Sequence, residues 1–110
     1  LDTAITQIRQ PLYLRLSDGC IQNSYEIKLT NYTQNPQLLK LSLAGLSEAT
    51  LDLGNIEVVT LRPEQQLRIL AKVRQVVNND KHEVSDFEFL VTSEDTTVAE
   101  KRIKARFYTP

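Results

Sequence analysis

Apolar and polar residues alternate along most of this chain. In residues 24–30, Tyr25, Ile27 and Leu29 share one face, and charged or hydroxyl side chains occupy the other. This period of two is typical of a strand with one buried face. The same pattern predicts further strands, separated by turn-forming residues, at 12–16, 39–44, 50–53, 56–61, 84–92 and 97–108.

One segment, residues 63–77, fits two structures. Pro63 and Glu64 suit the first turn of a helix, and several apolar residues that follow lie near helical spacing. The alternation of Leu67, Ile69 and the apolar residues up to Val73 instead matches a strand, and its β-branched side chains favour one. We therefore predict a strand over 67–77.

The last two predicted strands, 84–92 and 97–108, are expected to form a hairpin around residues 93–96. The inward residues of one strand must lie opposite the inward residues of the other. Two registers of the strand pair meet this condition. Glu88 lies opposite Arg102 in one register and opposite Lys104 in the other, so an acid meets a base in both. Cross-strand pairs contribute at most roughly 1 kcal/mol, so both registers stay open.

Together the short strands, the regular turns and the absence of a clear helix predict an all-β fold. We expect an immunoglobulin-like antiparallel β-sandwich of about seven strands. The sandwich is expected to span 9–110, preceded by an N-terminal linker at 1–8. A length of 110 residues fits one domain.

The amino-acid composition restricts which functions and which kinds of protein are possible. Thirteen basic and 14 acidic residues give a net charge of -1, which disfavours binding to nucleic acid. The chain has one cysteine, so it can form no internal disulfide. It has no methionine and no signal-peptide pattern, which predicts a piece of a longer protein. Its apolar runs are far shorter than the roughly 20 residues of a membrane helix.

Two motifs point to a family. The chain carries Arg-Gln-Pro-Leu at 9–12 and Asp-Gly-Cys-Ile-Gln-Asn-Ser-Tyr at 18–25, followed by an asparagine and a later glycine. In this order they resemble the C-terminal immunoglobulin-like domain of the FixG/CcoG family. The positions that carry the resemblance are Arg9, Pro11, Asp18, Gly19, Ile21, Asn23, Tyr25, Asn31 and Gly45.

The resemblance implies a membrane-anchored bacterial protein that assists the assembly of cbb-type cytochrome oxidase and its copper supply. Such a parent carries transmembrane helices and 4Fe-4S clusters, and this domain would lie at the periplasmic face of the inner membrane. An oxidase subunit or a copper-delivery protein would be its partner. Cluster binding needs several cysteine thiolates, so we expect no cofactor in this domain.

The motif residues themselves suggest a structural role. Asp18 and Gly19 suit a turn, because Asp binds nearby backbone and Gly accepts a positive φ. Asn23 can satisfy backbone groups where a strand begins, and Tyr25 can bury its ring and keep its hydroxyl at an edge. The motif offers neither a nucleophile nor a set of metal ligands.

Other candidate sites are weaker. Cys20 and His82 are the only soft metal ligands, and copper usually takes more of them. Ser85, His82 and Asp80 could be combined as a catalytic triad, but no oxyanion loop accompanies them. We therefore predict no catalytic, cofactor or metal site, with Cys20 and His82 as the candidate copper ligands.

Two surface features also have ordinary explanations. The basic residues within 101–106 could contact phosphate or an acidic partner, but both hairpin registers give them acidic neighbours, which favours a solvated strand face. Asn31 begins an Asn-Tyr-Thr glycosylation sequon, a pattern that often occurs by chance.

Three functions remain. The one that we favour is a non-catalytic interaction or scaffolding domain. The first alternative is direct copper binding or redox work through Cys20 and His82. The second is a generic adhesin-like sandwich repeat from a cell-surface protein, because the fold alone does not choose a function.

Overall fold

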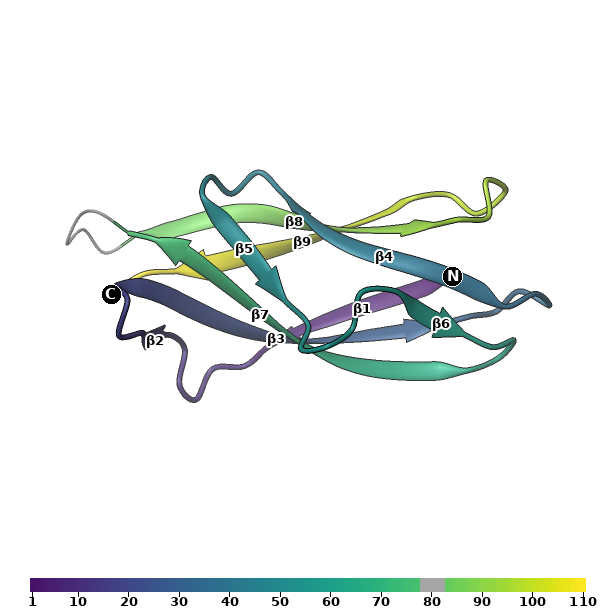
Figure 1. Ribbon diagram of the computed structural model, residues 1–110, viewed down its shortest axis with the longest axis horizontal. Helices are drawn as coiled ribbons and strands as arrows, with labels where there is room; N and C mark the ends of the chain where they lie inside the picture. Colours follow the sequence, from purple (N-terminus) through teal and green to yellow (C-terminus); the bar gives the residue numbers. More distant parts are fainter. Residues whose placement is uncertain (78–82) are drawn as a thin grey trace.

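The computed structural model describes residues 1–77 and 83–110, and these residues form strands and loops without a helix. Figure 1 shows the strands as an elongated body, 49 Å long and 20 to 23 Å across. The nine strands of the described residues are β1 (Asp2–Gln7), β2 (Leu14–Arg15), β3 (Cys20–Thr30), β4 (Gln37–Ala44), β5 (Ala49–Asp52), β6 (Val59–Leu61), β7 (Gln66–Val76), β8 (Val84–Ser93) and β9 (Lys101–Tyr108).

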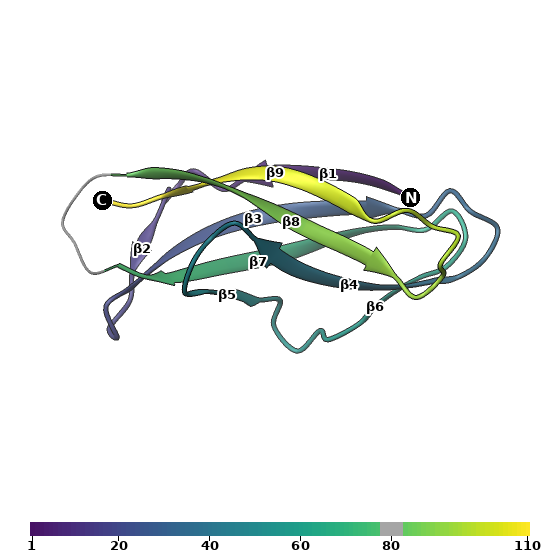
Figure 2. The same ribbon diagram turned by 90° about the horizontal axis from the view of Figure 1, so that it is seen from above.

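The strands form two antiparallel sheets that face each other. The first sheet has the order β1-β3-β7-β5, and β2 also pairs with β3. The second sheet has the order β6-β4-β8-β9. The edge strands β1 and β9, from opposite sheets, lie side by side (Figure 2). The predicted immunoglobulin-like sandwich is confirmed, with more strands than the seven expected.

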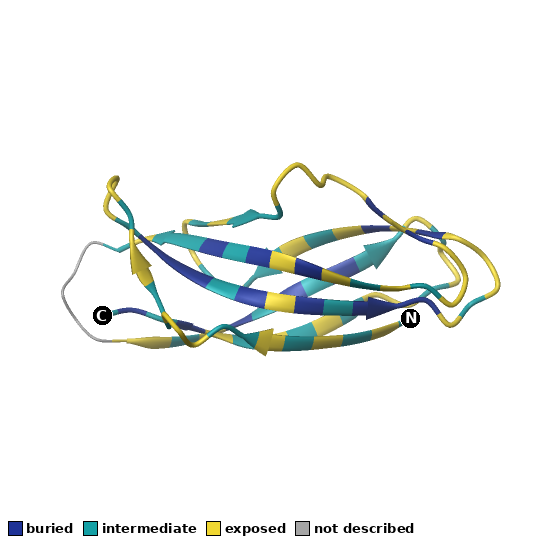
Figure 3. Cartoon of the chain, turned by 90° about the horizontal axis from the view of Figure 1, so that it is seen from below, coloured by how far each residue is buried: buried dark blue, intermediate teal, exposed yellow. Residues whose placement is uncertain are grey.

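The core lies between the sheets and is built by the predicted alternation. Buried and more exposed positions alternate along the strands in Figure 3. Three aromatic rings occupy its centre, where Tyr25 meets Phe87 and Phe89 edge to face at centroid distances of 5.8 and 5.2 Å. The buried hydrophobic residues are Ile21, Tyr25, Ile27, Leu29, Leu39, Val59, Leu61, Ile69, Ala71, Val73, Phe87, Phe89, Val91 and Phe107.

The ambiguous segment is a strand, as predicted. It forms most of β7, which pairs with β3 along its whole length from Gln66 to Val76. Leu70, the residue that breaks the alternation, is half exposed on the outer face of the sheet. Pairing with β3 therefore makes this segment a strand rather than a helix. Leu70, which does not fit the alternation, is tolerated on the surface.

The β8–β9 hairpin adopts the second of the two registers. Glu88 lies opposite Lys104, and Phe89 lies opposite Ile103. The connection is longer than residues 93–96, because β9 begins only at Lys101. Asp95 shapes this loop, since its carboxylate accepts hydrogen bonds from the backbone and hydroxyl of Thr97 at 2.9 and 2.7 Å.

Two boundary predictions were wrong. Residues 2–7, predicted as part of a linker, form β1, and Ile5 packs against the core. Ile5 is the one apolar side chain of this strand that packs against the core, so the strand carries almost no apolar alternation. The strand predicted at 12–16 shrinks to Leu14–Arg15, and Tyr13 packs on the core while Leu14 is exposed.

Candidate functional site

The turn before β3 is held by Asp18 and Gly19. The Asp18 carboxylate accepts a hydrogen bond from the backbone N–H of Cys20 at 3.0 Å, which holds the pKa of Asp18 below its ordinary value. Gly19 has a φ of 88°, a conformation that favours glycine. Its N–H donates to the carbonyl of Leu16 at 3.0 Å. These contacts and the backbone conformation of Gly19 form the turn.

Asn23 joins the two sheets. It lies on β3 of the first sheet and is fully buried. Its amide Nδ2 donates to the carbonyl of Tyr108 at 2.9 Å, and its Oδ1 accepts from the N–H of Tyr108 at 2.8 Å. The same oxygen accepts from Gln7 Nε2 of β1 at 3.1 Å. One side chain thus satisfies both backbone groups of a residue on the edge strand β9.

Tyr25, two residues after Asn23, also connects β3 to β9. Its hydroxyl donates to the carbonyl of Arg106 at 2.5 Å, and its ring is buried among the core phenylalanines. Burial raises the pKa of Tyr25 well above its ordinary value, with a smaller contribution from Tyr108. The phenol therefore stays protonated and serves as a hydrogen-bond donor.

Asn31 organises the loops at the other end of the sandwich. Its buried Nδ2 donates to the carbonyls of Asn35, Leu61 and Arg62 at 2.9 to 3.2 Å. Its Oδ1 accepts from the backbone and hydroxyl of Thr33 at 2.9 and 2.6 Å. The amide nitrogen of the sequon is fully engaged, so the folded chain offers no acceptor for glycosylation here.

Another buried polar residue, Gln37, could not be identified from the sequence motifs. Its Nε2 donates to Thr33 Oγ1 at 3.0 Å, and its Oε1 accepts from the Ser93 hydroxyl at 2.6 Å. It thereby joins the Asn31 loop to β8. The signal was its position, because Gln37 has the same inward parity as Leu39.

The remaining motif residues are divided between core and surface. Ile21 is fully buried in the core. Gly45 has a φ of 85° and ends β4, where the chain leaves the second sheet. Pro11 follows a cis peptide bond in the loop after β1. Arg9, in that loop, is exposed, and it makes no ion pair with any residue in 1–77 or 83–110.

The candidate copper site is only partly visible. Cys20 begins β3 opposite Val76 and is partly exposed, whereas His82 lies outside the described residues. Desolvation and the hydrogen bond with Asp18 raise the pKa of the Cys20 thiol. Among the described residues, no three His, Cys, Asp or Glu side chains gather into a metal site.

The other chemical candidates are equally limited. Of the Ser-His-Asp combination, only Ser85 lies within the described residues, because Asp80 and His82 fall outside them. A single cysteine cannot hold an iron-sulfur cluster, so the chain does not fit the cofactor that the resemblance implies for the parent. Within residues 1–77 and 83–110, no helix is long and apolar enough to cross a membrane.

The basic stripe lies on the outer face of β9 and has acidic neighbours, as predicted. Arg106 approaches Asp86 at 3.7 Å, and Arg102 approaches Glu88 and Glu100 at 3.7 and 3.6 Å. These pairs are largely exposed, so each contributes at most about 1 kcal/mol. They leave the stripe accessible to a partner.

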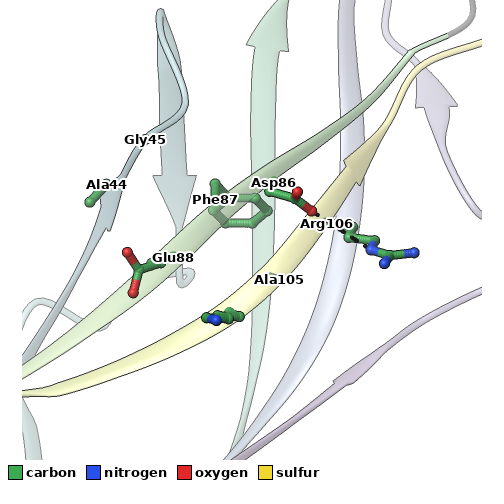
Figure 4. A pocket seen from close by; sticks show the side chains of 8 residues that line it. Ala44, Gly45, Asp86, Phe87, Glu88, Ala105 and Arg106 are labelled. Carbon is green, nitrogen blue, oxygen red and sulfur yellow. Dashed lines mark ion pairs between the residues drawn. The ribbon is translucent and has the colours of Figure 1, made fainter.

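A shallow hollow lies beside this stripe, where β4 ends and β8 continues without it (Figure 4). Its volume is about 570 Å³, and the small residues Ala44 and Gly45 form one side. Phe87 and Ala105 also line it, together with charges of both signs from Asp86, Glu88, Lys104 and Arg106. The hollow is open and salt-bridged, which suits contact with another surface better than enclosure of a substrate.

Comparisons with known proteins agree with this architecture. The chain resembles a crystal structure of a FixG-related protein from Vibrio parahaemolyticus, with a TM-score of 0.79 and 19% identity over 97% of this chain and 94% of that one. That likeness shows the fold.

Two curated relatives come from Cereibacter sphaeroides. Protein RdxA is 40% identical over 45 residues, and Protein RdxB is 34% identical over 53 residues. These matches cover 41% and 48% of this chain, but only 10% and 11% of the relatives. The chain therefore spans about a tenth of the length of these proteins.

A family model matches the whole chain, residues 1–110. It describes the IG-like fold at the C-terminal of FixG, which is given there as a proposed oxidoreductase. From the match over its full length, this chain belongs to the family of FixG C-terminal immunoglobulin-like domains.

Proposed function

We propose that this domain is a non-catalytic contact module of a membrane-anchored FixG-type protein. It would lie at the periplasmic face of a bacterial inner membrane and position its parent for the assembly of cbb-type cytochrome oxidase. The oxidase subunit that receives the parent, or a protein that delivers copper, would be its partner. Copper and 4Fe-4S chemistry would belong to other parts of that assembly.

One observation carries the proposal. The polar residues of the motif from Asp18 to Tyr25 are used to hold the sandwich together, by hydrogen bonds to Cys20, Tyr108 and Arg106. Side chains committed in this way are unavailable for catalysis or metal binding. The outer face of β8 and β9 carries accessible charges, with which the sandwich could meet another molecule.

A deletion tests this function. The full-length protein without the domain is compared with the intact protein for oxidase assembly, and immunoblotting checks that both are present in equal amounts. We expect oxidase assembly to fall after deletion, with the cluster-binding part still loaded, as read from its iron content. Normal assembly in the deleted strain would make the contact role untenable.

A further inference from the structure

A second hollow lies at the β5 edge of the first sheet. The short strand β5 pairs with β7 only from Lys72 to Gln75, and after Asp52 the chain leaves this sheet and runs to β6 of the other one (Figure 1). The departing loop, residues 68–70 of β7 and Lys72 line the hollow, whose volume is about 290 Å³. The hollow therefore lies where β7 continues beyond the end of β5.

The hollow has an apolar lining that is accessible to solvent. Leu53 is partly buried and packs against the core, which holds it in place. Leu70 and Ile56 remain 50% and 41% exposed. These three side chains come from β7 and from the loop after β5, and all of them line the hollow. The hollow beside β9 differs, because its apolar lining consists of small residues and the buried Phe87.

Cations border this apolar lining. Arg68 and Lys72 stand on either side of Leu70 on the outer face of β7. Glu26 approaches Arg68 only loosely, at 3.8 Å, and both side chains are largely exposed. The Lys72 ammonium makes no ion pair with any residue in the described part of the chain. Both cations are therefore accessible to the carboxylates of another molecule.

The carboxylate of the lining, Asp52, is already engaged. Its Oδ1 accepts from the N–H of Gly54 at 2.7 Å, and its Oδ2 accepts from Arg74 at 2.8 Å. The hydrogen bond from Gly54 and the nearby Arg74 hold the pKa of Asp52 below its ordinary value, with a smaller contribution from Lys72. Asp52 thus fixes the start of the loop.

The size of the hollow limits what it can hold. Sites that enclose a whole ligand measure roughly 300–1,000 Å³, so this hollow suits a single large side chain. An apolar side chain would contact Leu53, Ile56 and Leu70 and leave water. Carboxylates beside it would reach Arg68 and Lys72. One apolar anchor with charged neighbours is also the usual arrangement at the centre of a protein interface.

We propose that this hollow receives a large apolar side chain of a partner protein, flanked on both sides by acidic residues. The apolar side chain lies between Leu70 and the loop after β5, and the acidic residues pair with Arg68 and Lys72. This proposal rests on the contact function proposed above, and it names a surface for that contact and the chemistry of its partner.

Other occupants fit less well. In a symmetric dimer this patch would meet itself, and Arg68 and Lys72 of both copies would gather at one small interface. A membrane would need apolar side chains that project into lipid, whereas Leu53, Ile56 and Leu70 line a hollow.

The test uses the 110-residue chain and a short peptide that has one tryptophan between two pairs of glutamates. The chain has no tryptophan, so the fluorescence reports the indole of the peptide alone. We expect saturable binding, a blue shift of this fluorescence and a lower affinity at high salt. Nuclear magnetic resonance should place the amide shifts in residues 52–56 and 68–72. Shifts confined to another face, or no saturable binding at millimolar peptide, would overturn the proposal.

A pair of leucine variants tests the apolar lining. Leu70→Thr should weaken peptide binding by about tenfold, because the apolar contact is lost. Leu38→Thr replaces an exposed leucine on β4 of the other sheet and should change the affinity by less than about twofold. Urea unfolding checks that both variants are folded. Equal affinities of the two variants would contradict the site.

A pair of charge variants tests the rim. Replacing Arg68 and Lys72 by glutamine should weaken binding by about fivefold or more and reduce its salt dependence. The matched control replaces Arg106 and Lys104, which are likewise an arginine with a loose ion pair and a lysine with none among the described residues. This control should leave the affinity within about twofold. The same loss in both variants would show a general attraction of charge and overturn the proposal.

Two control peptides separate the two parts of the recognition. Alanine in place of tryptophan, and glutamine in place of every glutamate, should each weaken binding by about fivefold or more. Equal binding of either control peptide would overturn the proposal. So would self-association of the chain that Leu70→Thr abolishes, or binding of anionic phosphatidylglycerol vesicles without binding of the peptide.

The contact function can be judged separately in the full-length protein. If deletion of the domain impairs oxidase assembly but Leu70→Thr combined with the glutamine replacements of Arg68 and Lys72 does not, the site is wrong and the contact function stands. If the peptide binds the hollow but deletion leaves assembly normal, the contact function in oxidase assembly fails and the binding site stands.

Discussion

Asn23 of the first sheet pairs with both backbone groups of Tyr108 in the second, as a neighbouring strand would. Its amide and carbonyl lie 2.9 and 2.8 Å from the carbonyl and N–H of Tyr108. A carboxamide has the same donor and acceptor as a peptide group, so one buried side chain can close an edge of the sandwich. The pairing of β1 with β3 ends at Gln7 opposite Tyr25, two residues from Asn23 along β3.

Removing this carboxamide should destabilise the fold strongly. In Asn23→Ala, the N–H and carbonyl of Tyr108 lose their partner, and we expect a loss of about 2–4 kcal/mol in the free energy of unfolding. Urea denaturation measures it. Asn55→Ala, in an exposed loop, is the matched control and should change stability by less than about 0.5 kcal/mol. Equal effects of the two substitutions would contradict the closing role of Asn23.

The Tyr25 hydroxyl should give stability a pH dependence. Tyr25→Phe keeps the ring and loses the hydrogen bond to Arg106, so we expect a loss of about 1 kcal/mol at pH 7. Because burial raises the pKa of the folded phenol, its contribution is complete below the unfolded pKa of about 10 and is lost as the pH rises above it.

Tyr25→Phe should therefore reduce the fall of the free energy of unfolding with pH above pH 10. Above pH 10 the native chain should lose about 1.4 kcal/mol per pH unit more than Tyr25→Phe, for the one proton that the unfolded phenol releases. Tyr32→Phe, at an exposed tyrosine, should keep the native slope. Identical alkaline slopes for the native chain and Tyr25→Phe would show that the phenol is not protected by burial.

Disulfide trapping can test the hairpin register. In a Cys20→Ser background, cysteines at Glu88 and Lys104 should oxidise readily, because these residues face each other on the outer face of β8 and β9. Cysteines at Glu88 and Arg102 lie on a diagonal and should oxidise more slowly. Non-reducing electrophoresis follows both reactions. Faster closure of the Glu88 and Arg102 pair would favour the other register.

Cys20 should behave as an ordinary, slightly protected thiol. Desolvation and Asp18 raise its pKa, so its alkylation at neutral pH should be slower than that of free cysteine. Copper titration should give the native chain and Cys20→Ser the same affinity within about twofold. Tenfold weaker copper binding in Cys20→Ser would instead revive the copper-ligand hypothesis for Cys20 and His82.

Local patterns predicted much of this fold. The alternation in residues 24–30 identified the strand at the centre of the first sheet, and charge pairing limited the β8–β9 hairpin to two registers. The sequence could not choose between them, because Glu88 meets a basic residue in both. The choice appears only in the folded sandwich, where Phe89 lies opposite Ile103.

Other features depend on contacts between distant residues. A structural role for Asn23 could be predicted from its place at a strand start, but its partner Tyr108 lies 85 residues later. The strand β1 has little periodicity of its own and forms because β3 offers it an edge. The hollow lined by Ile5, Gln7, Lys104 and Arg106 likewise exists only once β1 and β9 lie side by side.

The central claim is that this domain acts through contact with a specific partner. The most direct measurement replaces it, in the full-length protein, with an unrelated immunoglobulin-like sandwich of the same length and then quantifies assembled oxidase. Equal amounts of the native and exchanged proteins are first confirmed by immunoblotting. We expect assembly to fall as far as it does on deletion of the domain. Full assembly with the unrelated sandwich would contradict the claim, because any folded spacer would then suffice.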